Sequence, residues 1–171
     1  MTTINLVIGA FLGAASSFFG SYALRRREVE DEKQNLASAF LGEIEALRLI
    51  VEKRHYIEDF ARAIEHVRQT GQPYWHGFRT RREPFNVFRE NVGKIGMLDS
   101  PLPELIVRYY TQGQAILEDM DSISEGTFNH LDANQCLDAL TQIHALFVDT
   151  RTLGQQIVSE IKAKYPSIKQ A

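Results

Sequence analysis

The chain has 171 residues, with 19 Lys or Arg against 22 Asp or Glu. This near-neutral balance argues against nucleic-acid binding by bulk charge. The single cysteine, Cys136, excludes an internal disulfide and fits a reducing compartment. Its position in a helical run predicts a small core residue rather than a nucleophile.

The N-terminal segment carries no charged side chain in its first 24 residues. The 21 uncharged residues from Ile4 to Leu24 would span roughly 31 Å as a helix, which matches the hydrocarbon core of a bilayer. This pattern predicts a single-pass transmembrane helix. It also places no ionisable group inside the membrane, so it does not favour a transport pathway.

Three basic residues, Arg25, Arg26 and Arg27, follow the uncharged segment directly. Positive charge tends to stay on the cytoplasmic side of a membrane. We therefore expect residues 1–24 to be an uncleaved anchor with its N-terminus outside. Residues 25–171 would then lie in the cytoplasm.

Two other interpretations of the N-terminal segment stay open. Small residues at Ala14-Ala15-Ser16 and Ser21-Tyr22-Ala23 would suit a cleavable signal peptide. Against this, residues 1–5 lack the basic side chains that precede the apolar run of a signal. A buried helix of a soluble domain is the second alternative, because serines and glycines make the segment only moderately hydrophobic.

Small residues recur every fourth position within the anchor, at Gly9, Gly13, Ser17 and Ser21. In lipid, such a stripe lets two helix backbones approach closely, with van der Waals contact and Cα–H···O bonds. It predicts transmembrane packing, either self-association or docking on another membrane protein. The alternative is an anchor that packs only against lipid.

The next predicted element is one long helix over residues 25–69, continuous with the anchor. Apolar residues recur at spacings of three and four from Leu36 to Val67, and no proline interrupts them. A straight helix of that length would extend about 67 Å. Gly71 and Pro73 predict its end, since glycine suits a left-handed cap and proline cannot continue a helix.

Three further helices are expected, at about 84–94, 101–123 and 131–165. Ser100 is the expected N-terminal cap of the second of these, and Pro166 the stop of the third. No alternating strand pattern of useful length occurs. The predicted fold is therefore all-α, with the transmembrane helix continuing into a long helix of an antiparallel bundle.

Two neighbouring tyrosines, Tyr109 and Tyr110, lie in the predicted helix 101–123. Adjacent helical residues are about 100° apart around the axis. We therefore expect one ring in the core and the other half exposed.

Three segments carry a resemblance to a known group of proteins: residues 85–91, residues 94–98 and residues 106–110. Their sequences are FNVFREN, KIGML and IVRYY. With the N-terminal anchor and the long helix, the chain resembles a loose group of uncharacterised bacterial single-pass inner-membrane proteins with a helical cytoplasmic domain. The resemblance covers most of the chain and implies a bacterial inner-membrane location, but it transfers no activity.

Catalytic and metal-binding signatures are absent from the sequence. It contains no glycine-rich phosphate loop, cysteine pair, His-Glu-x-x-His motif or nucleophile elbow. A di-iron bundle needs two Glu-x-x-His pairs, and only Glu52 and His55 show that spacing. Lys53 and Arg54 between them favour a solvated face. We therefore expect no enzyme, no cofactor and no metal.

The most distinctive cytoplasmic segment interleaves aromatic residues and arginines between the long helix and the next one. Such interleaving can anchor a partner protein, or stack on bases and bind phosphates. It can also cap the bundle with its rings while the arginines stay solvated. A straight preceding helix would hold it far from the lipid, whereas a break would reopen a membrane contact. The candidate partner-loop residues are Tyr74, Trp75, Phe78, Arg79, Arg81 and Arg82.

These patterns predict a non-enzymatic, membrane-anchored helical scaffold or adaptor that self-associates through the small-residue stripe. The alternative is an accessory or regulatory subunit of a larger membrane complex, in transport, stress response or phage defence. The first predicts a homo-oligomer and the second a membrane-protein partner. Neither interpretation favours nucleic acid as a partner.

Overall fold

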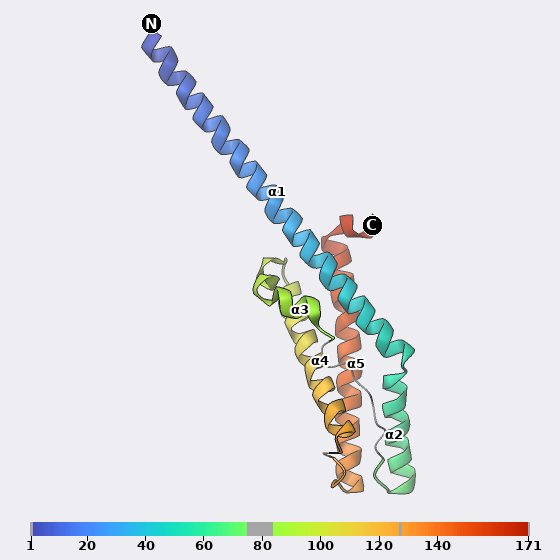
Figure 1. The fold of residues 1–171 in the computed structure, drawn as a ribbon. Helices are drawn as coiled ribbons and strands as arrows, with labels where there is room; N and C mark the ends of the chain where they lie inside the picture. The colour runs from blue at the N-terminus through green and yellow to red at the C-terminus, as the bar shows by residue number, and fades with distance from the viewer. Residues whose placement is uncertain (1, 75–83, 127, 171) are drawn as a thin grey trace.

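All regular secondary structure is helical in the part of the chain that the computed structural model describes, which comprises residues 2–74, 84–126 and 128–170. Side chains are described for residues 20–74, 84–126 and 128–168. This confirms the all-α prediction. In chain order (Figure 1) the elements are α1 (Thr2–Lys53), α2 (Tyr56–Thr70), α3 (Asn86–Asn91), the 3-10 helix η1 (Val92–Met97), α4 (Leu102–Ser124), α5 (Ala133–Lys164) and the 3-10 helix η2 (Pro166–Gln170).

Helix α1 is one continuous helix of 52 residues. Its N-terminal part projects away from the other helices, and its C-terminal part packs against them (Figure 1). We call the projecting part, residues 2–31, the arm. Within the described part of the chain, no helix combines the length and the apolar character needed to cross a membrane.

The predicted single helix over 25–69 is wrong, because the helix breaks after Lys53. His55 adopts a left-handed conformation with φ of 54°, and α2 begins at Tyr56 in a new direction (Figure 1). That conformation costs a non-glycine residue about 1–2 kcal/mol. The ring of Phe60 is fully buried against that of Phe147 at 5.4 Å, so packing of α2 on α5 offsets the strain.

The predicted cap at the end of α2 is confirmed, and the predicted cap at the start of α4 is wrong. Gly71 caps α2 in a left-handed conformation and donates its N–H to the carbonyl of Val67, as predicted. Ser100 does not cap α4, because the helix begins one residue later with Pro101 as its N-cap. At α5, Asp132 and Gln135 form a reciprocal capping box.

The remaining connections differ modestly from the predicted ranges. The helix predicted over 84–94 is a short α3 followed by the tighter η1. After α5, η2 turns back onto α1, where the hydroxyl of Ser167 donates to Oε1 of Gln34 at 3.0 Å.

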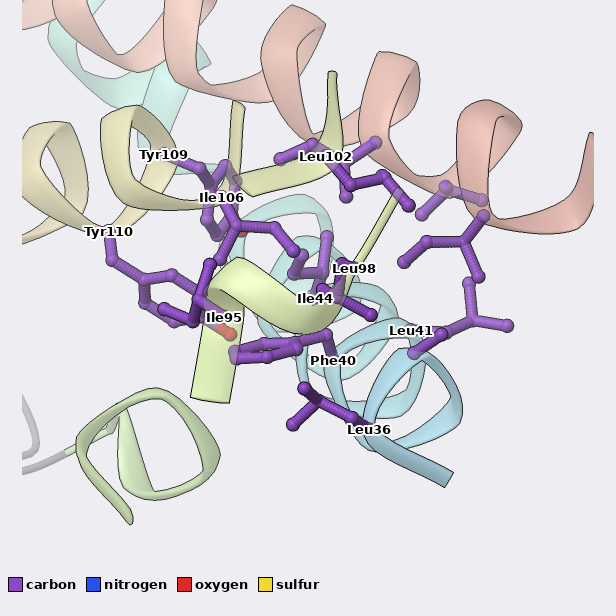
Figure 2. Packing of buried hydrophobic residues seen from close by; sticks show 14 of the residues in the cluster. Leu36, Phe40, Leu41, Ile44, Ile95, Leu98, Leu102, Ile106, Tyr109 and Tyr110 are labelled. Atoms are coloured by element: carbon purple, nitrogen blue, oxygen red, sulfur yellow. The ribbon is translucent and has the colours of Figure 1, made fainter. Parts of the chain in front are cut away.

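The core divides into two clusters along the bundle, and both use α4 and α5. The upper cluster joins α1, η1, the start of α4 and the end of α5, and Figure 2 shows part of it. The lower cluster joins α2, the end of α4 and the start of α5. Cys136 is fully buried in the lower cluster, as its predicted core position requires.

Both Tyr109 and Tyr110 are buried, so the expected half-exposed ring is wrong. The ring of Tyr110 stacks on Phe88 of α3, with ring centroids 4.3 Å apart and planes 18° apart. It also meets Phe85 edge-on at 5.3 Å. Helix α3 therefore covers the side of α4 that the periodicity of α4 alone assigned to solvent.

Candidate functional site

The predicted stripe residues and the three predicted topology arginines lie in the arm. Every residue from 20 to 31 is exposed, including Ser21 and the three arginines that follow the uncharged segment. Tyr22 and Leu24 are apolar residues among them, with 61% and 62% of their surface exposed. The predicted stripe residues Gly9, Gly13 and Ser17 lie outside the residues whose side chains are described.

The predicted partner loop is described only at its first residue. Tyr74 lies beside His66 of α2, with ring centroids 4.8 Å apart, and its carbonyl accepts a hydrogen bond from the Cys136 thiol at 3.9 Å. This fixes the start of the loop at the end of the bundle that lies away from the arm (Figure 1). Trp75, Phe78, Arg79, Arg81 and Arg82 lie outside the described residues.

A polar junction of three helices forms around Glu43 of α1. Its Oε1 accepts the backbone N–H of Val87 at 2.8 Å, and its Oε2 accepts that of Phe88 at 3.2 Å. The hydroxyl of Tyr110 donates to Oε2 at 2.6 Å. Glu43 thus satisfies two free amides at the start of α3 and ties α3 and α4 to α1.

Burial shifts the titration of both tyrosines beside this junction. Burial, together with the hydrogen bond to the Glu43 carboxylate, raises the pKa of Tyr110 far above its usual value. Burial also raises the pKa of Tyr109 to about 12, against a smaller lowering effect of the Arg48 charge. Both hydroxyls therefore stay protonated at neutral pH.

A cavity of about 300 Å³ lies between the two clusters, beside the break between α1 and α2. Leu47 and Phe85 line it and pack against the upper cluster. Val51 and Tyr56 line it and pack against the lower cluster. We call this cavity the junction pocket. Its position follows from the break, because a change of helix direction separates the side chains of the two clusters.

Side chains of α4 and α1 lie close to the backbone of α5 at Gly154. A Cβ atom there would lie 2.9 Å from Cε2 of Tyr109 and 3.2 Å from Cδ of Arg48. The absence of a side chain therefore lets α5 pack against α4 and α1 at one point. Arg48 lines the junction pocket, and its Nε is buried without a hydrogen-bond partner among the described residues.

Glu43 and Arg48 are not among the functional residues predicted from the sequence. A signal was present: Glu43 stands three residues after Phe40, and Arg48 four residues after Ile44, within the apolar repeat of α1. A charged residue at an inward-facing register position costs free energy unless it finds a partner. Such a position therefore indicates a polar contact or a site.

The candidate groups for metal or redox chemistry are the His, Cys, Asp and Glu side chains of the described residues. No group of three His, Cys, Asp or Glu there lies close enough to hold a metal ion. Glu52 and His55 are both exposed at the helix break. Burial raises the pKa of the Cys136 thiol, which disfavours its reactive thiolate form.

Comparison with known proteins adds no assignment. No protein-family model, curated protein or solved structure matches the chain.

Proposed function

We propose that the chain is a non-enzymatic, single-pass membrane-anchored helical scaffold or adaptor. In this proposal residues 1–24 anchor it in a bacterial inner membrane, with the N-terminus outside. Residues 25–171 form the cytoplasmic bundle, and the small-residue stripe joins copies of the anchor.

One observation carries the proposal: the described side chains of the arm, residues 20–31, do not pack on the bundle. All of these residues are exposed, and the first buried residue among the described side chains of α1 is Leu36. An isolated helix is marginally stable in water. This one includes the uncharged segment that ends at Leu24, so a lipid or protein environment would supply the stabilisation that the bundle does not.

The bundle suits a scaffold because several of its polar groups hold the helices together. Glu43 holds α3, and three ion pairs join α1 to later elements: Lys33 to Asp99, Glu32 to Lys94 and Glu45 to Lys162. Exposed pairs of this kind contribute little free energy singly but set the relative position of elements.

The test is to extract the intact protein from its native membrane in mild detergent and measure the mass and composition of the particle. A homomeric particle supports self-association. A stoichiometric second protein would instead make the chain an accessory subunit of a larger complex. Recovery of the full chain in the soluble fraction without detergent would contradict the anchor.

A double variant locates the contact. Gly13→Ile with Ser17→Ile places bulk on the stripe and should dissociate the particle, because close backbone approach is lost. Phe11→Ile with Ala15→Ile is the matched control on the opposite helix face and should leave the mass unchanged. Equal masses for both variants would argue against the stripe.

A further inference from the structure

The junction pocket has the size and walls of a site for a small ligand. Its volume of about 300 Å³ is roughly twice that of an engineered 150 Å³ cavity that holds benzene, and it reaches the lower end of natural ligand pockets. Most of its lining is apolar, from α1, α4 and α5, and includes Leu47, Val51, Ile116, Leu117, Met120 and Phe147.

Two arginines, Arg48 and Arg151, also line the pocket. Neither forms a salt bridge or a side-chain hydrogen bond within the described part of the chain. Both are partly buried, and the Nε of Arg48 is fully enclosed without an acceptor. A guanidinium withdrawn from water without an ion-pair partner is costly, so an anion beside it would be stabilised.

No acidic residue at the pocket forms a salt bridge with either arginine within the described part of the chain. Both oxygens of Glu43 are occupied by the α3 amides and by the hydroxyl of Tyr110. Glu52 is exposed at the rim. The unpaired guanidinium groups of Arg48 and Arg151 are therefore complementary to an anionic group, while the apolar lining is complementary to an apolar body.

We propose that the junction pocket binds a small amphipathic carboxylate, with an apolar body of about eight carbons inside the cavity. Its carboxylate accepts hydrogen bonds from the guanidinium groups of Arg48 and Arg151. The site goes beyond a scaffold function, because it places a ligand against both α1 and Tyr56 at the helix break. A ligand bound at this site would therefore affect the angle between the two core clusters.

The test uses the full chain in nanodiscs of neutral lipid, with empty nanodiscs to subtract partition into lipid. Equilibrium dialysis of radiolabelled octanoate, and of octanol as the neutral ligand of equal chain length, measures the two dissociation constants. Octanoate should bind saturably at one site per chain, and at least tenfold more tightly than octanol. No saturable octanoate binding, or equal affinity for the alcohol, would overturn the proposal.

Three variants then locate the carboxylate. Arg48→Gln and Arg151→Gln should each weaken octanoate binding at least tenfold and leave octanol binding unchanged. Arg108→Gln, at an exposed position of α4, is the matched control and should bind like the natural chain. Octanoate binding that survives in both pocket variants would overturn the assignment, and Arg151→Gln keeps the test valid if Arg48→Gln fails to fold.

A fourth variant tests the cavity itself. Val51→Phe adds volume inside the junction pocket and should abolish binding of octanoate and octanol together. Circular dichroism and amide exchange of the variant check that the bundle is intact. Unchanged binding in an intact Val51→Phe bundle would place the ligand elsewhere and contradict the proposal.

Discussion

The two core clusters share α4 and α5, but they attach their remaining helices in different ways. The upper cluster holds α1 by packing and by polar contacts, including Glu43 and the pair of Lys162 with Glu45 at 2.6 Å. In the lower cluster, α2 is held mainly by apolar side chains such as Phe60 and Val67. This difference leads us to expect that α2 can open while the upper cluster stays folded.

The largest expected effect comes from removing one buried ring in each cluster. Phe40→Ala and Phe60→Ala should each lower the free energy of unfolding by about 3–5 kcal/mol, since both rings are fully buried. The rates of amide hydrogen exchange should distinguish the two variants. Phe60→Ala should speed exchange in residues 56–70 and spare residues 33–53, whereas Phe40→Ala should speed both. An equal loss of protection from amide exchange across the whole chain in Phe60→Ala would instead show that the bundle unfolds as one cooperative unit.

The next largest effect on the free energy of unfolding should come from alkaline pH, which should destabilise the upper cluster. Burial raises the pKa of Tyr109 to about 12 from 10.0, so the folded chain holds this proton after the unfolded chain has lost it. The stabilisation is complete below pH 10 and is lost as pH rises through 12, by about 3 kcal/mol in all. Denaturant unfolding at pH 9, 10 and 11 measures it.

Tyr109→Phe is the control for this pH dependence. The variant keeps the ring but has no proton to lose, so its stability should fall less steeply above pH 10. A slope identical to that of the natural chain would mean that other groups cause the alkaline loss.

The polar junction should contribute less than a buried ring but more than a surface ion pair. Glu43→Gln removes the charge that accepts from two α3 amides and from Tyr110, and should cost about 1–3 kcal/mol. The amides of Val87 and Phe88 should exchange faster. Glu45→Gln removes the exposed pair with Lys162 and should cost at most about 1 kcal/mol. A larger effect from Glu45→Gln would reverse this ranking.

The smallest effect concerns the start of α5, at the lower end of the bundle. Asp132→Ala removes the side chain that accepts from the amides of Asn134 and Gln135, and should cost about 1 kcal/mol. Asp138→Ala, at an exposed position of the same helix, should change the melting temperature far less. Matching losses in the two variants would show that the cap adds nothing beyond the charge.

Helices with clear local signals could be predicted well from the sequence. The predicted ranges 101–123 and 131–165 correspond to α4 over Leu102–Ser124 and α5 over Ala133–Lys164, because apolar periodicity and the flanking prolines and glycines mark both. The break at His55 could not be predicted, because no glycine or proline marks it and packing of α2 on α5 decides it.

The junction pocket could not be predicted from the sequence either, because it too depends on tertiary packing. Its lining comes from α1, α2, α4, α5 and the residues before α3, and only the tertiary arrangement brings Arg48 and Arg151 to the same pocket. The covering of Tyr110 by α3 is likewise a long-range effect. The stripe at Gly9, Gly13 and Ser17 and the loop residues after Tyr74 stay predictions.

The contact between Ser167 and Gln34 has a practical consequence for measuring orientation. Gln34 lies about 14 Å from Arg25 along the axis of α1, at the helical rise of 1.5 Å per residue. Under the proposed anchoring, a fluorophore attached near the C-terminus would sit close to the lipid headgroups. A fluorophore in the turn between α4 and α5 would sit at the opposite end of the bundle (Figure 1). A quencher confined to the bilayer would reduce the fluorescence of the first label and leave that of the second unchanged. Two single-site labels would therefore report the orientation of the bundle relative to the membrane.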